Sequence, residues 1–416
     1  MAYITRIHVE NCRNVKVLDV DLSPNGPNVA GDEEPGSSTR TKLPFRHLIL
    51  TGPNGSGKSG VLRSISAHFN QFALMPHDGP SAGFDRISAR SLTNEGLQEN
   101  LGTAEIGWGT DSFKVLTSRY QSGDFFSLFT PAKRDFQQAK APGPSELNLN
   151  LASMRPDKSL GNLLLQFLVN KETERVHAFA DGDHATAERI KKWLDQLWLR
   201  MADLMEDRQL KVSYDRQSFT FRFRRSDGYE FDLNTLADGH AAAFALIAEI
   251  LLRIEAAQRL KKDFTFEPEG IVIVDEIETH LHLSLQEQIL PLLTTMFPKV
   301  QFIVATHSPA VIASIPDAVV YDLRKQKQFL SSDYQGIPYG VLMTEHFGIS
   351  SDIDLDSTGK LLRFRALAQQ ASRTPEEAHE MEDLAAMLSA RSQILATEVW
   401  MVKERLGLSN VQLAGE

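Results

Sequence analysis

Apolar positions divide this chain into short runs separated by longer amphipathic stretches. Ile4 to Glu10 and Val15 to Leu22 alternate between apolar and polar residues, as strands with one buried face do. Residues 45–51, Gly270 to Val274 and Val300 to Ala305 are largely apolar runs, which are typical of strands buried on both faces. Because such strands alternate with helical segments, the pattern predicts an α/β fold with a mostly parallel core sheet.

Helical spacing of apolar residues marks the segments between and after these strands. It predicts helices at Leu160 to His177, Ala185 to Asp207, Ala241 to Leu260 and Leu283 to Met296, and a mostly helical tail from Ser357 to Leu408. Lys114 to Ser118 is interpreted instead as a strand that ends in a polar turn at Gln121.

The chain therefore divides into an N-terminal lobe, a helical insertion, a C-terminal lobe and a helical extension. Their expected bounds are 1–130, 131–207, 208–330 and 331–416. Two stretches rich in proline, glycine and polar residues, 23–44 and 131–150, are expected to be loops.

Composition narrows the class of protein. Hydrophobic residues make up 42% and charged residues 24% of the 416 positions, as in soluble globular proteins. The single cysteine, Cys12, excludes a disulfide framework and suits a reducing cytosol. Neither a signal peptide nor an apolar run long enough to span a bilayer is evident, so we expect a cytoplasmic protein without a membrane segment. Because the formal charge is −10, nucleic-acid contact would need a local basic patch.

A phosphate-binding loop is the clearest chemical motif. Residues 52–59 read Gly-Pro-Asn-Gly-Ser-Gly-Lys-Ser and satisfy the P-loop pattern, between a predicted strand and a predicted helix. Glycines let main-chain N–H groups turn toward a phosphate, and the helix N-terminus adds partial positive charge. Lys58 is expected to reach the β- and γ-phosphates and Ser59 to hold Mg²⁺. The expected nucleotide-binding positions are Asn54, Gly55, Ser56, Gly57, Lys58, Ser59 and Gly60.

Two later strands end in residues suited to nucleotide hydrolysis. The apolar run 271–274 is followed by Asp275 and Glu276, which is the Walker B pattern. Asp275 is expected to hold Mg²⁺, and Glu276 to polarise the attacking water as a general base. The next predicted strand ends at His307, which is expected to contact the γ-phosphate.

A further motif, Leu236-Ala237-Asp238-Gly239-His240, opens the predicted helix that precedes Walker B. It stands where ABC ATPases carry their signature motif. In this order the four motifs resemble an ABC-class ATPase, and within that class the stand-alone SMC/RecF/OLD-like branch. The start of the chain is similar to that branch around Arg13, and residues 275–282 resemble its Asp-Glu-Pro-Glu-x-His-Leu-His run. Such ATPases recur in bacterial anti-phage systems of the Septu, PARIS and retron-associated kind.

The resemblance implies a mechanism and partners. Two copies, or a higher oligomer, would close head to tail around ATP and Mg²⁺, with each nucleotide held between one P-loop and the other copy's signature helix. The resemblance also adds Arg13 and Gly239 to the expected nucleotide-binding residues, and Gln121 to the expected metal site as a Q-loop glutamine. An effector encoded nearby, a nuclease or a toxin, would be the controlled partner, and a nucleic acid or a phage protein the trigger.

One residue departs from the family pattern. Ala237 replaces the signature serine, so a charge-assisted hydrogen bond worth on the order of 1.5–3 kcal/mol is missing from closure. We therefore expect weak or slow ATP turnover, or a dimer held largely by other contacts. A RecF/SMC-like DNA-repair ATPase that binds DNA directly is the alternative function, whereas no site supports a nuclease in this chain.

Two other metal-like patterns have simpler interpretations. His280 and His282, with nearby acids, have zinc-like spacing, but the family pattern places them in the loop after Walker B. The run Asp352 to Asp356 resembles the start of an EF-hand loop but lacks its glycine and its bidentate glutamate. We expect these acids to cap the helix that begins near Ser357.

Overall fold

The structure is a computed structural model that describes residues 2–24, 45–74, 86–92, 98–109, 113–134, 136–149, 155–156, 158–345, 347, 353–370 and 372–408. The chain splits into two compact units, Met1–Ile337 and Pro338–Glu416. The loop predicted at 23–44 lies almost wholly outside the described residues, as does Asp352. No helix in the described ranges has the length and apolar character needed to cross a membrane.

The first unit is built on a six-stranded sheet in the order β13-β12-β3-β11-β10-β6. All neighbouring strands pair in parallel except β12 with β13. The strands are β3 (His47–Thr51), β6 (Phe125–Thr130), β10 (Glu269–Val274), β11 (Val300–Ala305), β12 (Ala318–Asp322) and β13 (Lys327–Leu330). Every residue of β3, β11 and β12 is buried. The predicted α/β fold with a mostly parallel core sheet is therefore confirmed.

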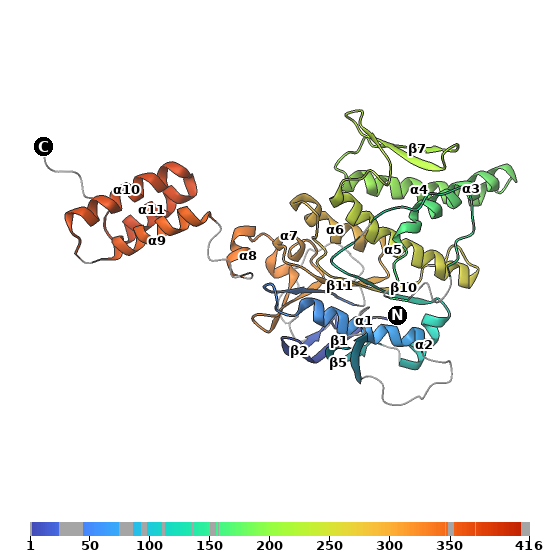
Figure 1. Cartoon of the computed structure of the whole chain (residues 1–416), viewed down its shortest axis with the longest axis horizontal. Coiled ribbons are helices and arrows are strands. Elements are labelled where there is room, and N and C mark those ends of the chain that lie inside the picture. Colours follow the sequence, from blue (N-terminus) through green and yellow to red (C-terminus); the bar gives the residue numbers. More distant parts are fainter. Residues whose placement is uncertain are drawn as a thin grey trace, which may run out of the picture. The chain divides into compact units, whose positions relative to one another are not determined.

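A second, antiparallel sheet has the order β2-β1-β5-β4. Its strands are β1 (Ile4–Cys12), β2 (Val15–Asp21), β4 (Arg86–Leu92) and β5 (Gln98–Trp108). Helix α1 (Lys58–Leu74) contacts strands of both sheets, and its Val61, Leu62, Ile65 and Phe69 are fully buried. Figure 1 shows α1 on one side of the core sheet and helices α5 and α6 on the other. The core sheet is thus covered by helices on both faces.

The remaining elements of this unit follow the sheet strands. The helices are α2 (Phe113–Gln121), α3 (Leu164–Ala180), α4 (His184–Leu204), α5 (Asp238–Lys261), α6 (Leu283–Met296) and α7 (Pro309–Ile312), with single 3₁₀ turns at Gly161–Leu163 and Ser331–Tyr334. In a small sheet of β7 (Lys211–Asp215), β8 (Thr220–Arg224) and β9 (Glu230–Phe231), the two phenylalanines of β8 pack on Trp198 of α4. Helices α3 and α4 correspond to the two helices predicted at Leu160 to His177 and Ala185 to Asp207, and they contact each other.

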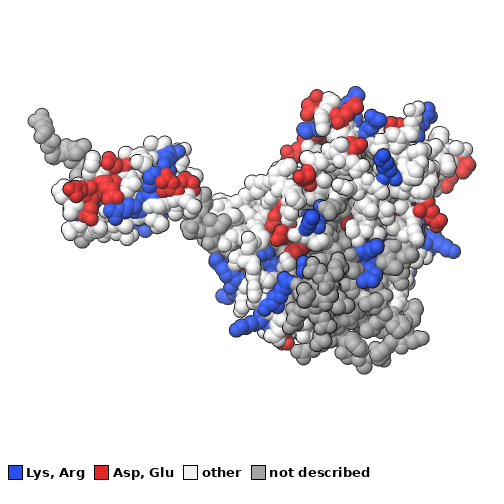
Figure 2. Space-filling model, viewed as in Figure 1, with Lys and Arg blue, Asp and Glu red and all other residues white. Residues whose placement is uncertain are grey.

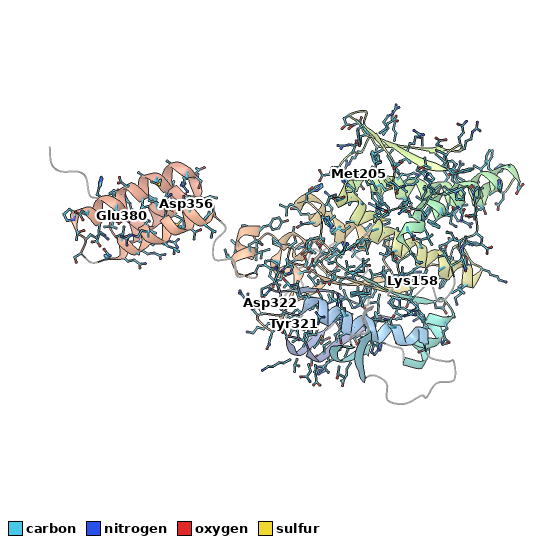
Figure 3. The ribbon with its side chains drawn as sticks, viewed as in Figure 1. Lys158, Met205, Tyr321, Asp322, Asp356 and Glu380 are labelled. Carbon is cyan, nitrogen blue, oxygen red and sulfur yellow. The ribbon has the colours of Figure 1, made fainter. Side chains whose placement is uncertain are left out.

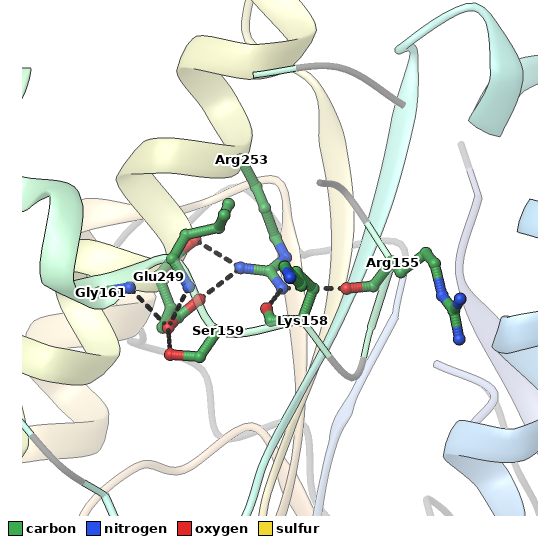
Figure 4. A network of polar contacts seen from close by, with 7 residues as sticks. Arg155, Lys158, Ser159, Gly161, Glu249 and Arg253 are labelled. Carbon is green, nitrogen blue, oxygen red and sulfur yellow. Dashed lines mark hydrogen bonds and ion pairs between the residues drawn. The ribbon is translucent and has the colours of Figure 1, made fainter. Parts of the chain in front are cut away.

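A buried ion pair fixes the insertion to α5. Arg253, which is fully buried, donates to Oε2 of Glu249 over 2.6 Å and to the carbonyls of Lys158 and Arg155 over 2.6 and 3.1 Å. Oε1 of Glu249 accepts from Ser159 Oγ and from the N–H groups of residues 160 and 161. Figure 4 shows both side chains projecting from α5 toward this segment. Because each buried charge has several partners, the pair holds the segment before α3 in place.

The second unit contains α8 (Tyr339–Glu345), α9 (Leu355–Gln369), α10 (Pro375–Arg391) and α11 (Gln393–Arg405). The last three helices share a core that includes Phe364, Leu367 and Leu388, all fully buried. Asp354 caps α9 by accepting from the N–H of Ser357 over 2.8 Å, which confirms the capping interpretation of this acidic run. Figure 3 shows Asp356 on α9 and Glu380 on α10 among the side chains of this unit.

Two parts of the sequence-based assignment are wrong or incomplete. Residues 113–121 form helix α2 and not a strand, because Leu116 and Tyr120 are buried at helical spacing. The sequence pattern does not predict strands β4, β5, β6, β12 and β13. The omission of β6 matters most, because this strand lies next to β10 and ends beside the site.

Candidate nucleotide site

The predicted site residues follow three neighbouring strands of the core sheet. Strands β3, β11 and β10 are adjacent and parallel, so their carboxyl ends lie at one edge. The P-loop follows β3, Asp275 follows β10, and His307 follows β11 after one residue. The N–H of Thr306 donates to Leu50 O over 3.0 Å and the N–H of Ile277 to Ala305 O over 3.1 Å. These bonds keep the three strand ends together.

Glycines shape the loop between β3 and α1. Gly52, Gly55 and Gly57 have φ angles of 141°, 77° and 103°, which L residues rarely adopt. A Cβ on Gly57 would also lie 2.7 Å from Cγ2 of Val15, at the start of β2. Asn14, in the β1–β2 turn, donates to Gly55 O over 2.6 Å. The loop is therefore held from outside by the antiparallel sheet.

Lys58 lies within this loop and is buried. Its ammonium group donates to the carbonyls of Gly52 and Pro53 over 2.9 and 3.2 Å. Burial lowers the pKa of Lys58, and the nearby acids Glu278, Glu276 and Asp275 oppose that change. An ammonium group held inside a glycine-rich loop of this kind is suited to bind phosphate oxygens.

Ser59 and Asp275 meet across the site. The Ser59 side chain hydrogen-bonds the buried carboxylate of Asp275, and burial raises the pKa of that carboxyl group. Oδ1 of Asp275 is buried and has no hydrogen-bond partner among the described residues. A hydroxyl beside an incompletely bonded carboxylate is the kind of oxygen-donor set that Mg²⁺ prefers. These two residues therefore fit the expected metal ion.

Glu276 occupies a strained position directly after Asp275. Its φ angle is 45°, in the left-handed region, and Thr279 Oγ1 donates to its Oε2 over 3.2 Å. The carboxylate is half-buried. Because Glu276 has this left-handed conformation, the direction of its side chain does not follow the alternation of side chains along β10.

His307 is connected to the same turn by Glu278. The main-chain N–H of His307 donates to Oε1 of Glu278 over 2.5 Å. Burial lowers the pKa of His307, and nearby Lys58 lowers it further, so the imidazole is neutral at pH 7. Burial also raises the pKa of Glu278. The sequence motifs do not assign Glu278 a separate role in the ATP site, although it lies two residues after Glu276.

The remaining predicted nucleotide residues lie at the margins of the loop. A Cβ on Gly60 would lie 3.2 Å from Cδ of Arg13, so this arginine packs against the first turn of α1. Gly239, in the first turn of α5, instead faces the loop after Walker B, where a Cβ would lie 2.7 Å from His280 O. His282 in that loop contacts the ring of His240 at 5.8 Å between centroids.

Gln121 is placed at the wrong edge of the sheet for a metal ligand. It ends α2 immediately before β6, whereas the P-loop and Asp275 follow strands parallel to β6. The length of a strand, roughly 20 Å for six residues, therefore separates Gln121 from Ser59 and Asp275. The predicted metal-binding role of Gln121 is wrong.

The residue that follows β6 into the site is Arg134, which no sequence motif marks. Its guanidinium group donates to the carbonyls of Asp275, Glu276 and Ile277 over 2.7, 3.0 and 3.4 Å. Burial lowers the pKa of Arg134 to about 10, and the neighbouring acids oppose this. The apolar run 125–129, bounded by polar residues, is the signal that could have found it, because a strand there would point residues 131–134 toward the Walker B turn.

Comparison with known proteins places this site in a family. The family described as "AAA domain, putative AbiEii toxin, Type IV TA system" matches residues 48–313, which include all of the strand ends described above. The Septu protein PtuA of Bacillus mycoides is 24% identical over 95% of this chain and 52% of its own length. The "Retron Ec83 probable ATPase" of Escherichia coli is 25% identical over 73% of this chain and 56% of its own.

The chain thus spans about half the length of these two curated relatives. It spans more of the Septu protein PtuA of Bacillus thuringiensis, with 24% identity over 83% of this chain and 88% of the relative. The SMC head domain of Thermotoga maritima gives a TM-score of 0.35 and 15% identity over 79% of this chain and 98% of its own. A score this low does not by itself indicate a shared fold. The family and the names of the relatives confirm the resemblance to stand-alone ABC-like ATPases of defence systems.

Proposed function

The chain belongs to this AAA-domain family, and on that premise we propose that it binds and hydrolyses ATP as an ABC-class ATPase and controls a partner effector in anti-phage defence. One observation carries the proposal. Lys58, Ser59, Asp275 and His307 lie at the ends of adjacent parallel strands, with the Ser59–Asp275 hydrogen bond joining the P-loop to Walker B.

Each residue has a distinct task in this proposal. The P-loop from Asn54 to Gly60 binds the phosphates, and Lys58 exchanges its bonds to loop carbonyls for bonds to phosphate oxygens. Ser59 and Asp275 hold Mg²⁺, which would neutralise charge that develops on the phosphates. Glu276 accepts a proton from the attacking water, and neutral His307 donates a hydrogen bond to the γ-phosphate.

Regulation requires a second copy of the chain. Gly239 packs on His280 and so fixes the first turn of α5, whose N–H groups bind the γ-phosphate held by the other copy. Closing two copies around two nucleotides makes assembly depend on ATP. Arg13, beside the first turn of α1, supports the nucleotide in the same closed state.

The defence role comes from the relatives. Their names associate them with Septu and retron systems, and stand-alone ATPases of such systems are the group that the motifs resemble. We propose that an effector encoded nearby, a nuclease or a toxin, binds this chain and is released or activated when the nucleotide state changes. A phage protein or a nucleic acid would act as the trigger.

Nucleotide binding and turnover test the enzymatic part. A fluorescent ATP analogue should bind the wild-type chain and Glu276→Gln with similar affinity, and Lys58→Ala at least about tenfold more weakly, because that variant loses a charge-assisted bond. Only the wild type should release phosphate. The ATPase proposal fails if the wild-type chain, folded and with Mg²⁺, binds no ATP.

Co-expression tests the partner. A tagged chain should retain the product of a neighbouring open reading frame through purification.

Direct DNA binding, the alternative function, predicts instead a DNA affinity that falls steeply with salt. Around β7, α3 and α4, Figure 2 shows acidic and basic side chains side by side. On β8, Arg222 pairs with Asp215 at 3.0 Å and Arg224 pairs with Glu230, so neither arginine on this sheet is a free phosphate contact.

A further inference from the structure

Arg134 makes an unusual contact with the main chain of the Walker B turn. Its Nη2 lies 2.7 Å from Asp275 O and 3.0 Å from Glu276 O, and its Nη1 lies 3.4 Å from Ile277 O. All three of these acceptors are consecutive carbonyls, 141 to 143 residues away along the chain. One side chain therefore holds the whole turn from its outer side.

The turn needs such support because its conformation is unfavourable for the residue it contains. Glu276 has a φ angle of 45°, whereas glutamate ordinarily avoids the left-handed region. Only the surrounding structure can keep it there. Thr279 supplies one restraint, with its N–H on Glu276 O at 3.0 Å and its hydroxyl on Glu276 Oε2 at 3.2 Å. Arg134 supplies the other, at the two peptide groups that flank the Cα of Glu276.

The chemistry of arginine suits this position. A guanidinium group is planar and presents several N–H donors in a fixed fork, so it can bind neighbouring carbonyls in one geometry. A lysine ammonium is a compact charge on a flexible stem and cannot fix them together. The pKa of Arg134 is lowered to about 10 by burial, so the group stays protonated at neutral pH and keeps all its donors.

We propose that Arg134 is a positioning residue that fixes the peptide groups on either side of Glu276 and thereby aims its carboxylate at the attacking water. This inference rests on the proposed ATPase function. Arg134 acts through Glu276, so its removal should slow the chemical step without weakening nucleotide binding, which depends on the P-loop.

Steady-state hydrolysis by Arg134→Met and Arg134→Lys, at saturating Mg²⁺, tests the proposal. Loss of about 1 Å of precision at a catalytic group can lower a rate on the order of 100-fold. We expect kcat to fall about 100-fold in Arg134→Met and about tenfold in Arg134→Lys, which restores charge but not the fork. The KM, and the stoichiometry of a bound fluorescent ATP analogue, should stay within about threefold of the wild type.

Arg253→Met is the matched control. Arg253 is likewise buried and donates to three main-chain carbonyls, of Glu249, Arg155 and Lys158, but it lies on α5 among residues 155–161. It should lower the melting temperature while kcat per folded molecule stays near the wild-type value. This control separates loss of a buried arginine from loss of its effect on Glu276.

Two results would overturn the proposal. The first is a folded Arg134→Met with wild-type kcat. The second is a fall in kcat matched by an equal fall in the amount of nucleotide bound, which would make Arg134 a folding residue. If the wild-type chain itself neither binds nor hydrolyses ATP, the proposed function fails instead. If Arg134→Met does not fold, the same comparisons on Arg134→Lys decide the question.

Discussion

The main-chain N–H of His307 donates to Oε1 of Glu278 over 2.5 Å. This bond joins the residues that follow β11 to the turn that follows β10. It links the group expected to contact the γ-phosphate with the turn that carries Glu276, the proposed general base. Glu278 also accepts a hydrogen bond from the Thr306 side chain, while its Oε2 is buried without a hydrogen-bond partner among the described residues. The carboxylate is thus an organising centre for the site.

Replacing Glu278 by alanine should destabilise the chain and slow hydrolysis. The partly buried N–H of His307 would lose its acceptor, which costs about 1 kcal/mol. Glu278→Gln keeps an acceptor oxygen and removes a charge whose burial raises its pKa, so it should be close to neutral in stability. Urea unfolding and phosphate release from both variants measure this. Equal losses in the two variants would show that the charge, and not the acceptor, matters.

Asp275 should make stability depend on pH in the metal-free chain. Because burial raises its folded pKa above 3.8, its favourable contribution is present below pH 3.8 and is lost as pH rises through the folded pKa. Asp275→Asn should therefore be more stable than the wild type at pH 7.5, with a smaller difference as the pH falls toward 4. Urea midpoints at several pH values, with EDTA present, test this.

Asp207 provides the control for that experiment. The N–H of Ser226 lowers the pKa of Asp207, so its favourable contribution is present above pH 3.8 and is lost on acidification. Asp207→Asn should be less stable than the wild type at pH 7.5, the opposite sign. An Asp275→Asn variant that is also less stable at pH 7.5 would contradict the burial argument.

Gly57 should tolerate alanine less well than Gly55. Both residues have positive φ angles, so each substitution costs about 1–2 kcal/mol in main-chain strain. Only at Gly57 would the new Cβ approach another group, at 2.7 Å from Val15 Cγ2, which adds about 1–3 kcal/mol. Thermal unfolding of both variants, and of Gly57→Ala combined with Val15→Ala, measures the difference. The second substitution should restore part of the loss, and no recovery would place the strain elsewhere.

Ala237→Ser should stabilise the chain and speed turnover. Ala237 is the N-cap of α5, with extended ψ of 146° and no side-chain hydrogen bond to the helix. A serine there can accept from a first-turn N–H, which is worth about 1 kcal/mol. In the closed dimer the same hydroxyl could instead reach the γ-phosphate of the other copy. Calorimetry and kcat measure the two effects, and Ala237→Gly, a weak cap without a hydroxyl, is the control.

If Ala237→Ser is more stable than the wild type but has the same kcat, the serine acts only as a cap of α5. A rise in kcat without a rise in melting temperature would assign it to the nucleotide alone. Either result would show that only one of the two effects, capping of α5 or contact with the nucleotide, occurs.

Sequence patterns predict the site where local spacing determines it. The P-loop is contiguous, and the strands that lead to Asp275 and His307 are largely apolar, so these strand ends can be aligned from the sequence alone. Residues 113–121 mislead because Val115 and Thr117 are β-branched, whereas the buried apolar positions, Leu116 and Tyr120, are four apart. The wrong assignment of Gln121 to the metal site is a consequence.

Other parts of the site depend on main-chain contacts that no spacing encodes. Arg134 binds carbonyl oxygens, which every residue carries, so its partners leave no mark in the sequence. Position 239 requires glycine because a Cβ there would lie 2.7 Å from His280 O, an atom of another loop. In both cases the tertiary arrangement of β6, β10 and α5 decides the role of the residue.

In the proposed function, ATP binding drives assembly of this chain. Light-scattering mass of purified Glu276→Gln, with and without ATP and Mg²⁺, tests it most directly, because this variant should bind nucleotide without consuming it. The mass should at least double with ATP, and it should not change when Lys58→Ala is combined with Glu276→Gln. A mass that is the same with and without ATP, in a variant shown to bind the nucleotide, would contradict the account.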